Sequence, residues 1–161
     1  MDSQSLPFSR YGLLLPEQSP YRMTLSEIEA AFGRSTHARR NIFDGFARGV
    51  SNLMEAGVER IVVGGSFVSQ KREPGDADIA WWFNPDIDWQ KLDPVFQVPE
   101  RRAARGKFLL DQRIDGIEEV PYEWSHEAFL RTNNRMPVGH QAVGIVQVAL
   151  ESGVGNRLTG I

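Results

Sequence analysis

The segment from Val62 to Phe83 constrains the fold of this chain more than any other. It places Gly64–Ser66 directly after an apolar run, then nine residues, then Asp76 and Asp78 at the start of a second apolar run. Short apolar runs bounded by Gly, Pro and Asp are typical of buried strands. The pattern predicts two successive core strands, with a glycine turn closing the first and a pair of acids opening the second.

The same segment carries groups suited to a triphosphate and its metal ion. Side chains alternate along a strand, so Asp76 and Asp78 are expected on one face. Mg²⁺ prefers oxygen ligands and is usually held by one or two carboxylates together with substrate phosphates. Gly64 and Gly65 allow backbone N–H groups to approach a phosphate, to which the Ser66 hydroxyl can donate. The alternative interpretation is a tight glycine turn followed by a polar turn, neither of which needs a ligand.

The spacing of these motifs resembles the signature of the polymerase-β-type nucleotidyltransferase superfamily. With its flanks, the chain is similar to a family of small, largely uncharacterised bacterial and phage proteins classed as nucleotidyltransferase-like, over roughly Gly12 to Leu150. Ala77 and Val143 depart from the isoleucine and lysine usual in that family. The flanking residues that carry the resemblance are Gly12–Pro16, Thr24–Glu29, Phe32, Gly33, Gly65–Val68, Lys71, Pro74, Phe129–Arg131 and Gly144–Val146.

The resemblance implies an enzyme that moves a nucleoside monophosphate from a nucleoside triphosphate to a hydroxyl of a protein or RNA acceptor. It implies Mg²⁺ or Mn²⁺ held by Asp76, Asp78 and a third acid, and phosphates held by Gly64, Gly65, Ser66 and Lys71. Asp111 fits the third acid best, and the alternatives are Asp115, Glu118, Glu119 and Glu123.

A second hypothesis is a catalytically degenerate module that binds a nucleotide or a partner protein in a toxin–antitoxin or defence system.

A basic group precedes the third expected strand and consists of Arg101, Arg102, Arg105 and Lys107. It either binds an RNA acceptor or only aids solubility.

Composition indicates one globular domain of 161 residues without cysteine, so disulfides and thiolate metal sites are excluded. A net charge of −3 gives no overall attraction to nucleic acid or to anionic membranes. The chain shows neither a signal-peptide pattern nor an apolar run of about 20 residues, so we expect a cytoplasmic protein without a membrane partner.

The predicted organisation is an extended arm over residues 1–23, one domain over 24–150 and a flexible tail over 151–161. Apolar periodicity and turn residues predict an α+β fold, in which helices flank a small mixed sheet. The expected helices lie at 24–33, at 38–56, in a segment that begins at Pro99, and at 125–131, and a loop is expected at 133–139. The expected strands lie at 60–63, 77–83, within 108–114 and at 143–150.

Overall fold

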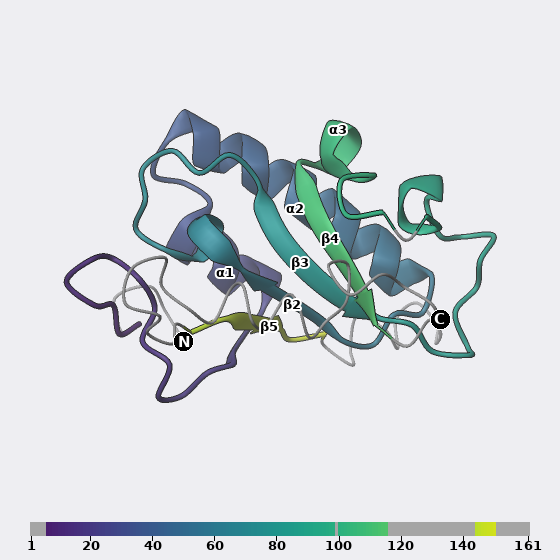
Figure 1. Ribbon diagram of the computed structural model, residues 1–161, viewed down its shortest axis with the longest axis horizontal. Helices are drawn as coiled ribbons and strands as arrows, with labels where there is room; N and C mark the ends of the chain where they lie inside the picture. Colours follow the sequence, from purple (N-terminus) through teal and green to yellow (C-terminus); the bar gives the residue numbers. More distant parts are fainter. Residues whose placement is uncertain (1–5, 99, 116–143, 151–161) are drawn as a thin grey trace.

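Five strands form one mixed sheet in the order β1-β5-β2-β3-β4 (Figure 1). The structure is a computed structural model that describes residues 6–98, 100–115 and 144–150. β2 pairs antiparallel with both β3 and β5, whereas β1–β5 and β3–β4 are parallel pairs. The strands are β1 (Tyr21–Met23), β2 (Ile61–Gly64), β3 (Ala77–Trp82), β4 (Leu110–Asp115) and β5 (Val146–Val148). This arrangement confirms the predicted α+β class.

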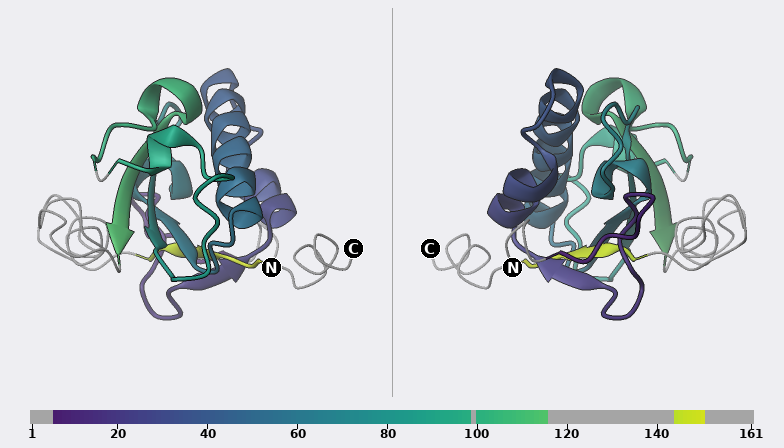
Figure 2. Two further views of the ribbon diagram at one scale, coloured as in Figure 1. Left: turned by 90° about the vertical axis from the view of Figure 1, so that its right-hand side faces the viewer. Right: turned by 90° about the vertical axis from the view of Figure 1, so that its left-hand side faces the viewer.

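Helices α1 (Leu25–Phe32) and α2 (His37–Glu55) lie on the same side of the sheet (Figure 2). Thr24 caps the N-terminus of α1. Its side chain accepts a hydrogen bond from the Glu27 backbone N–H, and the Glu27 side chain accepts one from the Thr24 backbone N–H. This is the capping box that the sequence predicts.

Within the described parts of the chain, no helix is long and apolar enough to cross a membrane.

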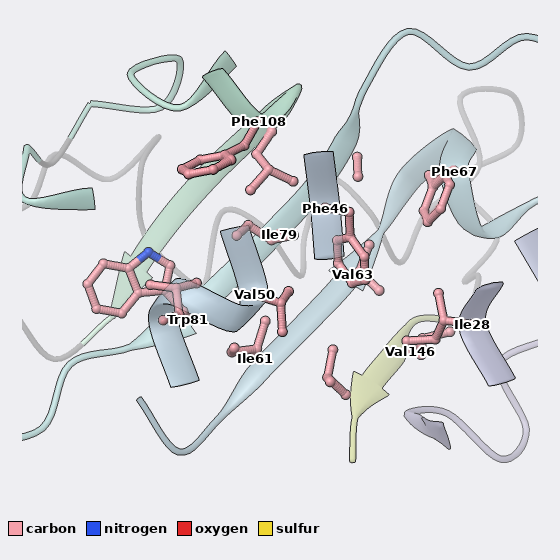
Figure 3. Close-up of a cluster of buried hydrophobic side chains, with 14 of the residues drawn as sticks. Ile28, Phe46, Val50, Ile61, Val63, Phe67, Ile79, Trp81, Phe108 and Val146 are labelled. Atoms are coloured by element: carbon pink, nitrogen blue, oxygen red, sulfur yellow. The ribbon is translucent and has the colours of Figure 1, made fainter. Parts of the chain in front are cut away.

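The main core fills the space between the sheet and α2 (Figure 3). Alternate residues of the strands face α2, among them Val63 of β2 and Ile79 and Trp81 of β3, and all three are fully buried. α2 contributes a buried stripe that includes Phe46 and Val50. The predicted 3–4 spacing of apolar residues on this helix is therefore confirmed.

The alternate residues on the other face of the sheet form a second, smaller buried cluster. Val62 of β2, Ala80 of β3 and Ile145 meet there, and Trp82 packs against them. Asp78 lies two residues before Ala80 and so belongs to this face. The acids of β3 are thus separated from the main core by the sheet itself.

The helix predicted from Pro99 is confirmed only in its last residues, because among the described residues 100–108 the helix is limited to α3 (Arg105–Phe108). The carbonyl of Arg101 accepts a hydrogen bond from the Gln112 backbone N–H at 2.7 Å instead of bonding within a helix. α3 then ends at Leu109, which has left-handed backbone angles (φ 56°, ψ 41°). Pairing with β4 therefore overrides the helical propensity of the segment.

The N-terminal arm contributes more regular structure than the sequence suggests. Its last residues form β1, which pairs with β5 at the edge of the sheet, and Leu6, Leu14 and Tyr21 are buried. The predicted helix at 125–131, the loop at 133–139 and the tail at 151–161 lie outside the described residues.

Candidate metal and nucleotide site

Three neighbouring strands place the predicted site residues in one row across the sheet. In the strand register, Gly64 at the end of β2 is the partner of Asp78 in β3, and Asp78 is the partner of Asp111 in β4. Asp76 directly precedes β3 and lies two residues from Asp78, on the same face by strand alternation. Residues far apart in the sequence are therefore brought together by strand pairing.

The three aspartates converge closely enough to share a divalent cation. One carboxylate oxygen from each of Asp76, Asp78 and Asp111 lies within 4.8 Å of the others. All three donors are carboxylate oxygens, which suit Mg²⁺ or Mn²⁺. With metal–oxygen distances of about 2.0–2.1 Å, neighbouring ligands of an octahedral ion are about 2.9 Å apart and opposite ligands about 4.2 Å apart. The chemistry of the donor set therefore fits such an ion, and the three carboxylates would move closer together to bind it.

The register also distinguishes Asp111 from the other acids considered for the third position. Asp115 is the partner of Trp82, at the opposite end of the β3–β4 pair from Asp78. Glu118, Glu119 and Glu123 lie outside the described residues. Among the described acids, Asp111 is the one that joins Asp76 and Asp78.

Asp78 has the most strongly shifted acid–base equilibrium of the three acids. Burial raises its pKa from 3.8 to about 7, and the nearby negative charges of Asp76 and Asp111 act in the same direction. The positive charges of Arg113 and Arg101 act in the opposite direction but do not cancel this effect. A divalent cation at this position would relieve the repulsion between the carboxylates.

Two of the three acids are held by arginine side chains. Arg105 Nη1 lies 2.6 Å from Asp76 Oδ2, and Arg101 Nε lies 3.0 Å from Asp111 Oδ2. Arg113 donates to the second carboxylate oxygen of Asp111. Sequence reasoning placed Arg101 and Arg105 in a basic group that either binds an RNA acceptor or only aids solubility, and it overlooked Arg113. Its position two residues from Asp111 on the same strand was the available signal, because it puts both side chains on one face.

The predicted phosphate-binding turn follows β2 directly. Gly65 has a positive φ of 78°, a conformation that favours glycine, and it begins the short 3₁₀ helix η2 (Gly65–Val68) that contains Ser66. Because Gly64 is the strand partner of Asp78, this turn starts beside the acids.

A buried arginine on α2, which sequence reasoning also overlooked, holds this turn in place. Arg39 is only 3% exposed, and its guanidinium donates to the backbone carbonyls of Ser66 (3.2 Å), Phe67 (2.7 Å) and Ser69 (2.6 Å). Its Nε also donates to the Lys71 carbonyl at 3.0 Å. Arg39 therefore fixes the path of the chain from the glycine turn to Lys71.

Lys71 is exposed, although its backbone carbonyl accepts the hydrogen bond from Arg39. No ion pair ties it to an acid within residues 6–98, 100–115 and 144–150. Its predicted contact with phosphate stays a prediction.

Comparison with known proteins yields one family and no further relatives. No curated protein and no solved structure matches the chain. A family model does match it over residues 6–149, which is most of its length and includes every residue of the candidate site. The chain therefore belongs to the family of unknown function DUF6932.

Proposed function

We propose that this protein is a Mg²⁺- or Mn²⁺-dependent nucleotidyltransferase. It would transfer a nucleoside monophosphate from a nucleoside triphosphate to a hydroxyl of a protein or RNA acceptor. The observation that carries the proposal is the convergence of Asp76, Asp78 and Asp111 beside the Gly64–Ser66 turn. The acceptor class and a possible partner protein rest on the superfamily resemblance, and a cytoplasmic location rests on the sequence pattern alone.

The geometry supports this chemistry because nucleotidyl transfer needs positioning and charge more than covalent help from the protein. A bound divalent ion would neutralise phosphate charge and align the reacting oxygens. Asp76, Asp78 and Asp111 would hold it, while backbone N–H groups of the Gly64–Ser66 turn would orient the phosphates. The acceptor oxygen bonds to the α-phosphorus as the bond to the leaving pyrophosphate breaks, and the hydroxyl proton passes to solvent.

A second candidate function is nucleotide binding without transfer. The observation that favours it is the pairing of Asp111, through both of its oxygens, with Arg101 and Arg113. If those contacts persist in the loaded protein, they neutralise the charge of Asp111 and weaken its hold on an ion, so that Asp76 and Asp78 remain as the main ligands. Transfer of a labelled nucleotide to an acceptor distinguishes the two functions, since the binding module would form no covalent product.

Calorimetric titration of the four ribonucleoside triphosphates in the presence of Mg²⁺ tests the shared binding step. We expect at least one nucleotide to bind, and binding to require Mg²⁺. The double variant Asp76→Asn/Asp78→Asn should reduce affinity at least about 100-fold, because the metal loses two charged ligands.

The matched control is Asp86→Asn/Asp88→Asn, which removes the same charge from two exposed acids that follow the far end of β3. This control should bind like the wild type. Absence of binding by all four nucleotides, or equal loss in both double variants, would contradict the proposal.

A further inference from the structure

The arginines at the candidate site contact three of the carboxylate oxygens that could bind a metal ion. Arg105 contacts Oδ2 of Asp76, and Asp111 has one arginine on each oxygen. The cluster therefore contains three acids and three arginines with no net formal charge. Each carboxylate oxygen has two lone-pair sites, so an arginine opposes a divalent ion mainly through its charge: a guanidinium held against the oxygen repels the incoming cation and weakens its binding until the contact is given up.

Two of these arginines differ from the third in their freedom to move. The side chains of Arg101 and Arg105 are 34% and 44% exposed, whereas that of Arg113 is 6% exposed. Arg101 and Arg105 both belong to the turn and short helix that precede β4, at the end of the sheet where β3 and β4 begin (Figure 1). They can turn away from the acids without disturbing the core, while Arg113 is fixed.

Arg113 supplies an independent sign that a ligand with acceptor atoms belongs here. Its guanidinium is buried against Asp111, yet its Nε hydrogen has no acceptor within the described part of the chain. Buried donors are almost always paired, so an unpaired one calls for an explanation. A phosphate oxygen is a suitable acceptor, because arginine recognises phosphate through several of its N–H groups.

We propose that Arg101 and Arg105 are polyphosphate ligands. Until a metal ion replaces them, Arg101 pairs with Asp111 and Arg105 pairs with Asp76. The ion takes the carboxylate oxygens, and the released guanidinium groups bind the phosphates that enter with it. The inference rests on the proposed function, because it assigns the same acids to a metal–triphosphate complex. It predicts that these arginines oppose binding of the metal alone and favour binding of the phosphates.

Arg105→Gln tests this pair of opposite effects. Binding of Mn²⁺ alone, followed by electron paramagnetic resonance of the free ion, should become about three-fold tighter, because a half-exposed competing ion pair is removed. Binding of inorganic triphosphate at saturating Mn²⁺, followed by calorimetry, should become about ten-fold weaker, because a charge-assisted hydrogen bond is lost. Arg101→Gln should change both affinities in the same directions.

The matched control is Arg102→Gln, which removes the same charge from an exposed side chain of the same turn. Arg102 makes no ion pair with an acid in the described ranges. Both affinities should stay within two-fold of the wild type. Thermal melting of each variant checks that the fold is retained.

The possible failures are distinguishable. If wild type binds Mn²⁺ through Asp76 and Asp78 but Arg105→Gln changes neither affinity, this inference is overturned and the metal site survives. Weaker Mn²⁺ binding in Arg105→Gln overturns it as well, because the arginine would then only position Asp76. If neither wild type nor variants bind Mn²⁺, the inference and the proposed function fail together.

Discussion

Asp78 is the residue at which the stability of the metal-free protein and the proposed metal binding oppose each other. Its folded-state pKa of about 7 lies above the ordinary value of 3.8, so the folded state binds the proton more tightly than the unfolded state. The stabilisation from that proton is fully present below the unfolded pKa and is lost as the pH rises through 7. Above pH 7 the folded protein holds a buried carboxylate near Asp76 and Asp111, which a metal ion would stabilise.

Asp78→Asn is therefore expected to stabilise the metal-free protein, since the amide resembles the protonated acid at every pH. The gain in the free energy of unfolding at about pH 8 should be on the order of 2–4 kcal/mol and should shrink towards zero near pH 4. Urea denaturation in a chelating buffer at several pH values measures it. The exposed control Asp86→Asn should show no such dependence, and a gain that is equal at all pH values would refute the explanation.

Arg39 shows how one side chain can organise a loop without touching a ligand. Within the described residues it has no acidic partner, and its charge is satisfied by backbone carbonyls from Phe32 to Lys71. Burial lowers its pKa, as expected for a cation removed from water. Its position on α2 ties the site turn to the main core.

At the scale of the elements, α2 and α3 are held together by a close approach that only glycine permits. A Cβ atom added to Gly45 would lie 2.2 Å from the carbonyl oxygen of Phe108, which is backbone and cannot move aside cheaply. The contact places α3, and with it Arg105, at the start of β3 and β4. The glycine in the middle of α2 therefore serves packing.

Gly45→Ala should destabilise the protein by about 1–3 kcal/mol or more, because the overlap outweighs the gain of about 1 kcal/mol that alanine brings to a helix. Gly106→Ala is the matched control in α3, where no atom lies within 4 Å of the added methyl group. That variant should be neutral or slightly stabilised. Urea denaturation compares the two, and a stabilised Gly45→Ala would contradict the packing argument.

The elements that the sequence predicts well are those with a strong local pattern. The apolar stripe of α2 and the acid pair at the start of β3 are both visible in short windows, and both elements lie within a few residues of the prediction. β1 was missed because three residues of strand depend on a partner, β5, more than 120 residues later in the chain. Helical propensity around Arg101 was misleading because pairing with Gln112 decides that backbone.

The same contrast holds for the candidate site. Asp76 and Asp78 are two residues apart in sequence and share a strand face, so their proximity follows from alternation alone. The superfamily resemblance favours Asp111 over Asp115, and the register of β3 with β4, which periodicity does not reveal, places Asp111 beside Asp78. The contacts of Arg101 and Arg105 with these acids join residues that only the folded chain brings together.

At the scale of the whole molecule, the sheet separates the main core from the candidate metal site. Its face that is covered by α1 and α2 forms the main core (Figure 2). The other face carries the acids and the small cluster of Val62, Ala80 and Ile145. A ligand can therefore bind and change the charge at the site while the packing of the main core stays the same. The overall charge of −3 says little about this site, because its acids and arginines balance locally.

The central claim is that Asp76, Asp78 and Asp111 form a divalent-metal site. The most direct test is anomalous diffraction from crystals of the wild-type protein grown with Mn²⁺ and inorganic triphosphate. We predict an anomalous peak within about 2.5 Å of carboxylate oxygens from these residues, with Arg105 turned from Asp76 towards phosphate. A well-ordered triad with no peak, and with its arginine contacts unchanged, would contradict the claim.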